Sequence, residues 1–252
     1  MLKNKEHIDI ILPNYNSSKY LKQAINSVLM QTYKKWQLII IDDCSDKKTL
    51  NLLKKFNKHR KIKIYYQKKN HGAGFCRNFG MKKSKSPYVA FIDSDDIWNK
   101  NKLKMQINFM KKNHYSFSYT YYETFGEKKK IITPPLSFNF KSFIKNTSIG
   151  TSTMMIERKK LKNIRFTNSK ICEDYYFKCK LLKKVNFAYC LNKFLTKYRI
   201  RNNSMQSNNL KNIFWIWKIN KDFNKLSFLN NLFSIINISI NSIKKYGGKN
   251  FF

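Results

Sequence analysis

Acidic residues are scarce in this chain. Only 14 Asp and Glu residues stand against 51 Lys and Arg residues, so the formal net charge at pH 7 is +37. A charge of this size favours anionic partners such as nucleotide diphosphates, lipid headgroups or nucleic acid. The alternative is compositional drift, because Lys, Asn, Ile, Phe and Tyr are all abundant and drifted lysines would simply cover solvated faces. We expect drift to be the larger cause, with attraction to an anionic membrane surface as its consequence.

The sequence also lacks paired cysteines and long apolar runs. Its 5 cysteines are scattered and none forms a C-x-x-C pair, which argues against a disulfide framework or a zinc site and favours reduced thiols. No apolar run reaches the ~18–20 residues that a transmembrane helix needs. The first residues lack the apolar core of a signal peptide. We therefore expect a cytoplasmic protein, at most attached to the inner face of the plasma membrane.

What the first half does contain is a regular alternation of short apolar runs and amphipathic segments. The runs typical of buried strands cover residues 8–12, 37–41, 62–66 and 88–92. Apolar residues at helical spacing lie between them, and Ser17 or Ser18 is expected to cap the first helix. This β-α-β-α-β-α-β order predicts an α/β fold with a Rossmann-like, mostly parallel sheet and helices on both faces.

The second half is less regular. Residues 115–122 alternate polar and aromatic side chains, which indicates an antiparallel or edge strand. A helix is expected from Glu173 and a further strand over residues 188–198. We divide the chain into a domain over residues 1–207, with halves 1–98 and 99–207, and a C-terminal helical appendage over residues 208–252.

The appendage contains one apolar helical face. Its members are Leu229, Leu232, Phe233, Ile236, Ile240 and Ile243. Such a face either packs on the main domain or on another subunit, or lies in a membrane interface with lysines meeting anionic headgroups. Packing is the commoner fate of an amphipathic helix, and all three alternatives stay open from the sequence.

Two acidic clusters follow predicted strands. Asp42 and Asp43 end the second strand, and Asp93, Asp95 and Asp96 end the fourth. The carboxyl ends of neighbouring parallel strands meet at one crevice, where open α/β sheets bind ligands. Carboxylates this close repel one another unless a cation lies between them, and oxygen ligands suit Mg²⁺ or Mn²⁺. The alternative is a polar turn in which Asp96 or Asn99 caps the next helix.

A glycine-rich loop at residues 70–80 lies between the two clusters in sequence. It does not match the dinucleotide fingerprint G-x-G-x-x-G, because the third glycine position holds Arg77, and it lacks the Lys-Ser/Thr of a P-loop. The position of Arg77 in such a loop favours a phosphate contact, and a local salt bridge is the alternative.

Taken together, these segments resemble family 2 glycosyltransferases with the GT-A fold. The matching pieces are residues 10–16, 41–46, 73–80, 91–96, 149–152, 172–175 and 198–204. Their order and spacing fit the family over about 200 residues, which is far more specific than any one motif, and the likeness fades in the C-terminal region.

The resemblance implies an inverting transfer of a sugar to a hydroxyl of a glycan or lipid-linked acceptor, in cell-surface polysaccharide synthesis. The donor is a nucleotide-diphosphate sugar, with a UDP-sugar favoured. Asp174 is the implied catalytic base, and Asp95, with Asp93, the implied ligand of Mn²⁺ or Mg²⁺. The residues implied to hold the nucleotide sugar are Pro13, Tyr15, Asn16, Asp42, Asp43, Gly74, Arg77, Asp93, Ser94 and Arg201.

Arg201 departs from the family, because many members carry a histidine there in a Tyr-Arg-x-His segment. An arginine cannot ligate a metal, but it can hold a diphosphate with two hydrogen bonds. Two other hypotheses stand beside the enzyme. A nucleotide-sugar-binding relative without activity is disfavoured by the retention of Asp95 and Asp174. A basic nucleic-acid-binding protein is disfavoured by acidic clusters at the binding face, so we expect no nucleic acid partner.

Overall fold

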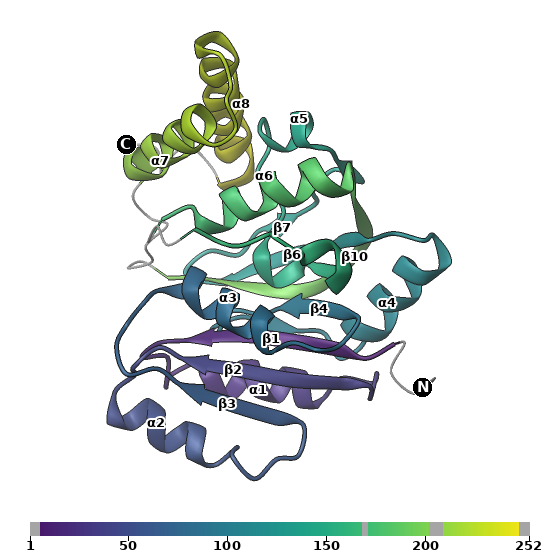
Figure 1. Cartoon of the computed structure of the whole chain (residues 1–252), viewed down its shortest axis with the longest axis vertical. Coiled ribbons are helices and arrows are strands. Elements are labelled where there is room, and N and C mark those ends of the chain that lie inside the picture. Colours follow the sequence, from purple (N-terminus) through teal and green to yellow (C-terminus); the bar gives the residue numbers. More distant parts are fainter. Residues whose placement is uncertain (1–5, 168–170, 202–208, 247–252) are drawn as a thin grey trace.

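The computed structural model describes residues 6–167, 171–201 and 209–246. Within these residues the strands form one ten-stranded sheet that runs through the molecule with helices on both sides (Figure 1). The strand order is β3-β2-β1-β4-β9-β6-β10-β5, with β7 paired to β6 and β8 paired to β10.

The first half follows the predicted alternation, and its four strands are parallel to one another, whereas β4 pairs antiparallel with β9 on its other side. The strands are β1 (Ile8–Asn14), β2 (Trp36–Asp42), β3 (Ile62–Tyr66) and β4 (Tyr88–Phe91). The helices between them are α1 (Leu21–Leu29), α2 (Lys47–Lys54) and α3 (Ala73–Lys83). Asn14 pairs with Asp42 in the register of β1 and β2, so the polar ends of both strands meet at one edge of the sheet.

The sheet is buried on both faces, which explains why its strands are continuous apolar runs. Successive side chains on a strand point to opposite faces. Ile11 and Ile41 belong to the core on the side of α3 and α6, whereas Ile10 and Ile40 belong to the core on the side of α1 and α4. The predicted doubly covered parallel sheet is therefore confirmed for this half.

Gly80 allows α3 to lie very close to the sheet. A Cβ atom at this position would stand 2.6 Å from Cγ2 of Ile11 and 2.9 Å from Cδ1 of Ile41, closer than side-chain atoms pack. The absence of a side chain at Gly80 thus sets the distance between α3 and strands β1 and β2. Since Arg77 lies one helical turn earlier, this packing also fixes the depth of its guanidinium.

The second half is mixed in strand direction. Its strands are β5 (Ile97–Trp98), β6 (Phe117–Gly126), β7 (Ile131–Ile132), β8 (Ser137–Phe138), β9 (Met155–Glu157) and β10 (Ala188–Ile200). Its helices are α4 (Lys102–Lys112), α5 (Phe140–Phe143) and α6 (Glu173–Val185), with 3-10 turns at Thr151–Thr153 and Arg158–Leu161. β6 pairs antiparallel with β9 and parallel with β10, so the antiparallel alternative is confirmed and the edge-strand alternative is wrong. The aromatic side chains of Phe117 and Tyr119 fill the core on the face of α6.

The predicted caps of α1 and α4 are also wrong. α1 begins after Tyr20, while the Ser17 hydroxyl donates to the side chain of Asn14. α4 begins after Asn101 with no side-chain cap, and Asp96 instead accepts from the backbone N–H of Arg199 at 2.9 Å. Ser17 thus bonds a local partner in the preceding turn, and Asp96 bonds a tertiary partner, instead of capping a helix.

Two C-terminal helices, α7 (Asn209–Asp222) and α8 (Phe228–Tyr246), form a hairpin beyond α5 and α6 (Figure 1). The predicted boundary of the appendage at residues 207 and 208 lies outside the described residues, so the domain division stays a prediction. Among the described residues, no helix combines the length and apolar character needed to cross a membrane.

Candidate active site

The two carboxylates at the end of β2, Asp42 and Asp43, are buried and hydrogen-bonded. Asp42 accepts hydrogen bonds from the Asn14 side chain at 2.6 Å and from the backbone N–H of Ser45 at 3.1 Å. Asp43 accepts from the backbone N–H groups of His71, at 3.0 and 3.1 Å, and of Gly72, at 2.7 Å. Asp43 therefore holds the glycine-rich loop in place, and Gly72 adopts the positive φ of 91° that this loop requires.

Three other predicted nucleotide residues lie beside this cluster. Pro13 is buried within β1, whereas Tyr15 and Asn16 are exposed at the carboxyl edge of the sheet. The side chain of Asn16 accepts from the backbone N–H of Asp46 at 2.7 Å, which ties the end of β1 to the start of α2. Tyr15, with 51% of its surface exposed, is the group here that is free to meet a ligand ring.

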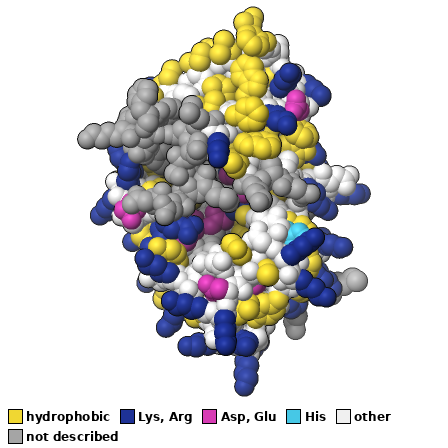
Figure 2. Space-filling model, turned by 90° about the vertical axis from the view of Figure 1, so that its left-hand side faces the viewer, with side chains coloured by type: hydrophobic (Ala, Val, Ile, Leu, Met, Phe, Trp, Pro, Cys, Tyr) yellow, Lys and Arg dark blue, Asp and Glu magenta, His cyan; other side chains and the backbone are white. Residues whose placement is uncertain are grey.

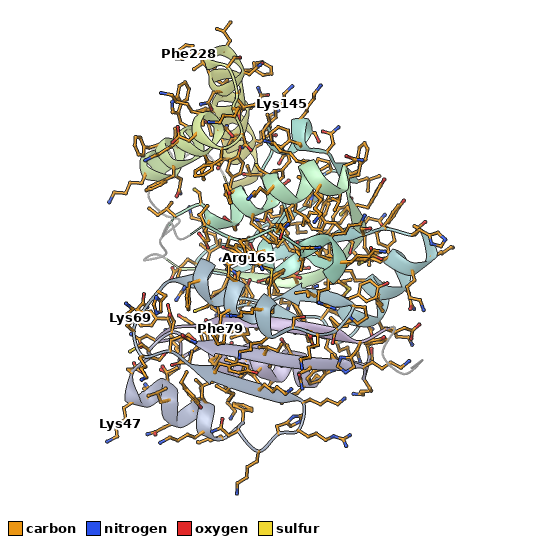
Figure 3. The ribbon with its side chains drawn as sticks, viewed as in Figure 1. Lys47, Lys69, Phe79, Lys145, Arg165 and Phe228 are labelled. Carbon is orange, nitrogen blue, oxygen red and sulfur yellow. The ribbon has the colours of Figure 1, made fainter. Side chains whose placement is uncertain are left out.

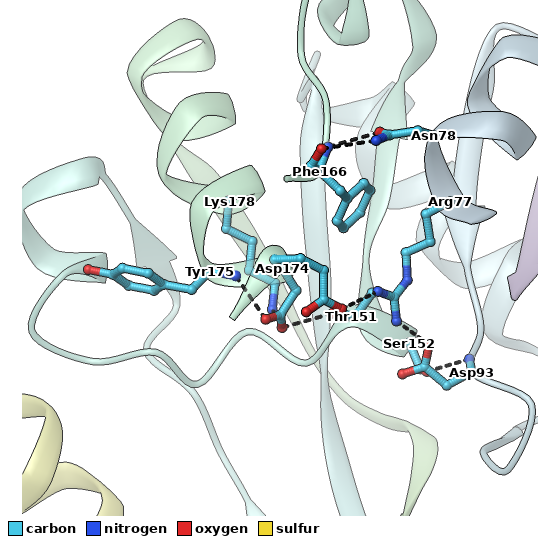
Figure 4. Close-up of polar contacts among 10 residues, drawn as sticks. Arg77, Asn78, Asp93, Thr151, Ser152, Phe166, Asp174, Tyr175 and Lys178 are labelled. Atoms are coloured by element: carbon cyan, nitrogen blue, oxygen red, sulfur yellow. Dashed lines mark hydrogen bonds and ion pairs between the residues drawn. The ribbon is translucent and has the colours of Figure 1, made fainter. Parts of the chain in front are cut away.

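Arg77 bridges the two halves of the chain (Figure 4). Its guanidinium donates to Asp93 at 2.7 Å and to Glu173 at 2.8 Å, and the side chain is only 6% exposed. Burial by itself lowers the pKa of Arg77, but the two carboxylates outweigh burial and raise it above its ordinary value. The local salt bridge that we left as an alternative is thus present, and a phosphate contact by Arg77 stays a prediction.

Gly74 brings α3 against the segment before α6. A Cβ atom there would stand 2.5 Å from the backbone oxygen of Thr167 and 3.1 Å from Cγ of Glu173. The close packing of the two halves therefore requires a glycine at position 74. The same packing places Glu173 within reach of Arg77.

The second acidic cluster is short of partners. Asp95 forms an ion pair with Arg201 at 2.9 Å, and burial together with the Asp93 charge raises the pKa of Asp95. Asp96 is 1% exposed, and its Oδ2 has no hydrogen-bond partner among the described residues. Burial and the charges of Asp93 and Asp95 raise the pKa of Asp96 well above its usual range. Ser94, between them in sequence, is half-buried.

A divalent cation fits this cluster chemically. Clustered carboxylates whose pKa values are raised by mutual repulsion are stabilised by a cation, and oxygen ligands suit Mg²⁺ or Mn²⁺. The described residues contain no group of three or more His, Cys, Asp or Glu side chains placed to hold a metal ion. The unpaired Asp96 oxygen and the raised pKa of Asp95 are therefore the observations that favour a cation here.

Asp174 opens α6 and has well-defined partners. Its Oδ1 accepts from the backbone N–H of Tyr175 at 2.8 Å, and its Oδ2 accepts from Lys178 at 2.6 Å and Thr151 at 3.2 Å (Figure 4). Burial raises the pKa of Asp174, but Lys178, Arg77 and Thr151 outweigh burial and lower it to about 2. The carboxylate is thus ionised at neutral pH, and 28% of the side chain is exposed.

The turn at Thr151–Thr153 connects the acidic strand end to Asp174. Ser152 accepts from the backbone N–H of Asp93 at 2.9 Å, while its neighbour Thr151 donates to Asp174. Asp93, Arg77, Glu173 and Asp174 therefore form one connected region. The sequence did not assign roles to Thr151, Ser152 or Lys178. Lys178 was detectable, because a lysine four residues after an aspartate on a helix is placed to pair with it.

The last predicted segment, residues 198–204, is described only to Arg201, and residues 202–204 lie outside the described residues. Arg201 is about half exposed and reaches Asp95, as given above. Arg199 donates to the backbone oxygen of Asp95 at 2.9 Å. Arg199 in β10 and Arg201 just beyond its end thus line the acidic cluster and supply positive charge where a diphosphate would lie.

A separate hollow of about 560 Å³ lies at the opposite, amino-terminal edge of the sheet. Its lining includes His7, Asp9, Lys63 and Lys85. Asp9 there accepts hydrogen bonds from the backbone N–H groups of Lys85, at 2.7 Å, and Ser86, at 2.9 Å, so it organises a turn. We place the candidate site at the carboxyl edge, because the carboxylates with raised pKa values and the arginines at the end of β10 lie there.

Comparison with known proteins shows the family of the chain. Residues 9–184 match the sequence model of glycosyl transferase family 2. TuaG, a Bacillus subtilis protein whose name assigns it to teichuronic acid biosynthesis as a glycosyltransferase, is 34% identical over 96% of this chain and 98% of its own length. The Escherichia coli UDP-Glc:alpha-D-GlcNAc-diphosphoundecaprenol beta-1,3-glucosyltransferase WfgD is 34% identical over 95% of this chain and 94% of its own length.

Solved structures show the same fold. S. aureus TarS in complex with UDP-GlcNAc gives a TM-score of 0.74 at 22% identity, over 94% of this chain and 73% of that chain. The mannosyltransferase PcManGT from Pyrobaculum calidifontis, in complex with GDP-Man and Mn²⁺, gives 0.70 at 10% identity, over 98% of this chain and 77% of that chain. At these identities the likeness concerns the fold alone, and it confirms the predicted GT-A-like architecture.

Proposed function

This chain belongs to glycosyl transferase family 2, and from that premise we propose that it moves a sugar from a UDP-sugar to a hydroxyl of a lipid-linked acceptor during cell-surface polysaccharide synthesis. The observation that carries the proposal is the connection through Arg77, which joins Asp93 at the end of β4 to Glu173 at the start of α6. Asp174 follows Glu173 directly, which supports a donor site and a base that act side by side.

Asp174 is the proposed base. As the acceptor oxygen forms a bond to the anomeric carbon, the acceptor O–H bond breaks and its proton moves to the Asp174 carboxylate. The bond between the anomeric carbon and the diphosphate oxygen breaks at the same time, and its electron pair leaves with the nucleotide diphosphate. Attack from the face opposite the leaving group inverts the anomeric carbon. The low pKa of Asp174 keeps the base ionised before transfer.

Asp95 and Asp93 are the proposed holders of Mn²⁺ or Mg²⁺. When bound, this ion would offset the negative charge that develops on the departing diphosphate. Arg201 and Arg199 are proposed to add positive charge from the β10 side, where the family's histidine is replaced. Tyr15 and Asp43 are proposed to line the pocket of the base and ribose.

The proposed location is the cytoplasmic face of the membrane. WfgD, by its name, acts on a diphosphoundecaprenol acceptor, and 34% identity over nearly the whole of both chains supports an acceptor of the same kind here. A lipid-linked acceptor is presented at a bilayer surface, so an enzyme that uses it works at that surface.

Thermal unfolding with nucleotides tests the donor site. UDP, GDP, CDP and ADP are each added with and without Mn²⁺ to the wild type, to Asp95→Asn and to Asp222→Asn, a matched control on exposed α7. A ligand at a hundred times its dissociation constant adds ~2.7 kcal/mol of stability. We expect UDP with Mn²⁺ to raise the melting temperature of the wild type and of Asp222→Asn but not of Asp95→Asn. If none of the nucleotides raises the melting temperature of the wild type, the donor site is contradicted.

Asp174→Asn tests the base separately. We expect transfer from a UDP-sugar to fall by about 10²–10⁴-fold, which is the usual contribution of a general base. The UDP-dependent melting shift should stay, because Asp174 is not in the proposed nucleotide pocket. Transfer at the wild-type rate would show that another group takes the proton.

A further inference from the structure

The apolar face predicted on α8 points away from the protein. Its six members have these exposed fractions: Leu229 75%, Leu232 41%, Phe233 53%, Ile236 47%, Ile240 46% and Ile243 42%. Phe228 is 67% exposed and stands at the far end of α8 (Figure 3). Figure 2 shows hydrophobic side chains gathered over the top of the molecule, where α7 and α8 lie, with Lys or Arg side chains at their margins. These exposures exclude the alternative in which this face packs on the main domain, and leave a second subunit and a membrane interface.

The orientation of α8 is fixed by polar contacts on its inner side. Asn231 and Ser234, each 1% exposed, bond to the buried Asn220 of α7 at 3.1 and 3.0 Å. Ser234 also donates to the backbone oxygen of Ile144 at 2.6 Å, and Asn231 donates to the backbone oxygen of Trp217 at 3.0 Å. Turning the helix over would bury apolar side chains and leave these buried polar groups without partners, which is costly. The buried polar contacts of α8 therefore fix its apolar face on the outside of the hairpin.

The surroundings of this face are positively charged. Asp222 is the only acidic residue in the sequence after Asp174. The Lys145 ammonium lies 4.9 Å from the ring centroid of Phe233 (Figure 3), and the Lys218 ammonium lies 5.5 Å from the ring of Trp215. Lys221 of α7, Lys244 of α8 and Lys225 in the loop between them are also exposed. An apolar stripe flanked by lysines is complementary to a bilayer with anionic headgroups.

We propose that the outward face of α8 docks the protein on an anionic phospholipid bilayer, with its apolar side chains among the acyl chains and the lysines at the headgroups. A second copy of the chain fits this face less well, because two surfaces so rich in lysine repel one another. The inference deepens the proposed membrane location and rests on it, but it does not depend on sugar transfer.

Vesicle flotation with the full chain tests the docking face. The vesicles contain phosphatidylcholine alone or phosphatidylcholine with phosphatidylglycerol, without donor or acceptor, at ~0.1 M and ~0.5 M NaCl. One variant carries Leu232→Gln, Ile236→Gln and Ile240→Gln. The control carries Met30→Gln, Ile131→Gln and Leu136→Gln, which removes three apolar side chains that are 63%, 69% and 63% exposed elsewhere. Leu229→Gln alone serves if the triple α8 variant melts early.

We expect wild type and control to float with the phosphatidylglycerol vesicles and the α8 variant to bind at least ~10-fold less, since three aliphatic side chains leave the contact. Higher salt and phosphatidylcholine alone should each weaken binding. Absence of wild-type binding, or an equal loss in the control, would overturn the docking face. If the protein does not float but forms a dimer without lipid, and only the α8 substitutions make that dimer dissociate, the face binds a second copy instead.

The UDP-dependent melting shift is measured on the same three proteins. If flotation fails while this shift is retained, the docking face is wrong and the proposed transferase stands. If the shift fails while flotation is retained, the docking face stands and the donor site is wrong.

Discussion

Lys178 sets how basic Asp174 is. Its ammonium is buried, 4% exposed, and bonds to the same carboxylate oxygen as Thr151. Burial alone raises the pKa of Asp174. Lys178 makes the largest of the opposing contributions, which together lower this pKa to about 2. A group with a depressed pKa stabilises the fold above its unfolded pKa of ~4, and that stability is lost as pH falls toward 2. Lys178 is a positioning residue that acts through Asp174.

We expect Lys178→Met to move the acidic limb of the kcat/KM profile to higher pH. Without the ammonium, burial dominates, so the Asp174 carboxylate takes up a proton at a higher pH and the base is lost there. The measurement is transfer between pH 4 and 8. Lys180→Met removes the same charge from an exposed position on the same helix and should leave the limb in place. Equal profiles for the two variants would remove Lys178 from this role.

Asp96 supplies a second residue-scale prediction. Its pKa is raised by burial and by Asp93 and Asp95, so ionising it costs stability as pH rises above its unfolded pKa of ~4. Asp96→Asn keeps the oxygen that accepts from Arg199 and removes the charge. We expect Asp96→Asn to raise the melting temperature at pH 7 without metal. The gain in the free energy of unfolding is ~1.4 kcal/mol for each unit by which the pKa of Asp96 was raised. Asp222→Asn is the exposed control, and a lower melting temperature for Asp96→Asn would contradict this account.

At the scale of elements, the important contact joins α6 to the C-terminal hairpin. The hydroxyl of Tyr175, next to Asp174, donates to the Asn220 side chain at 2.7 Å, and Asn220 in turn bonds Asn231 and Ser234 on α8. One buried asparagine therefore holds three helices together. The hairpin is tied to the helix that carries the proposed base, so binding of the hairpin to a surface would also fix that helix.

Asn220→Ala should loosen this three-helix contact. It leaves Tyr175, Asn231 and Ser234 each short of a buried partner, and each such group costs about 1–3 kcal/mol. We expect the free energy of unfolding in urea to fall by at least ~2 kcal/mol. Asn230→Ala, at an exposed position of α8, is the control and should be nearly neutral. Similar losses in both variants would mean that the network adds little.

At the scale of the whole molecule, the net charge of +37 opposes the compact state. Salt screens this self-repulsion, because the Debye length falls from ~10 Å at 0.1 M to ~3 Å at 1 M. We therefore expect the melting temperature to rise with NaCl, by ~2–4 °C for each ~1 kcal/mol added to the free energy of unfolding. Sucrose of equal osmolality controls for effects other than screening. A melting temperature that falls with NaCl would show that the native ion pairs outweigh the repulsion.

The sequence by itself determined the parallel half of the sheet and the positions of the carboxylates. Alternating buried runs and amphipathic segments fix β1 to β4 and α1 to α4, because local periodicity and right-handed crossovers leave few arrangements. Asp42, Asp93 and Asp174 fall at element ends, and the ends of parallel strands converge whatever the rest of the chain does. The interior position of β6 did not follow, because its partners β9 and β10 are distant in sequence.

Only the tertiary structure decided what each polar group touches. Arg77 looked like a phosphate ligand from its loop, and its two carboxylate partners became visible only when residues 93 and 173 were brought together. The outward face of α8 was likewise hidden, because the sequence shows that a helix has an apolar side but not which side its neighbours cover. That choice was made by Asn220 and Ile144, whose polar atoms need the partners that the other side of α8 offers.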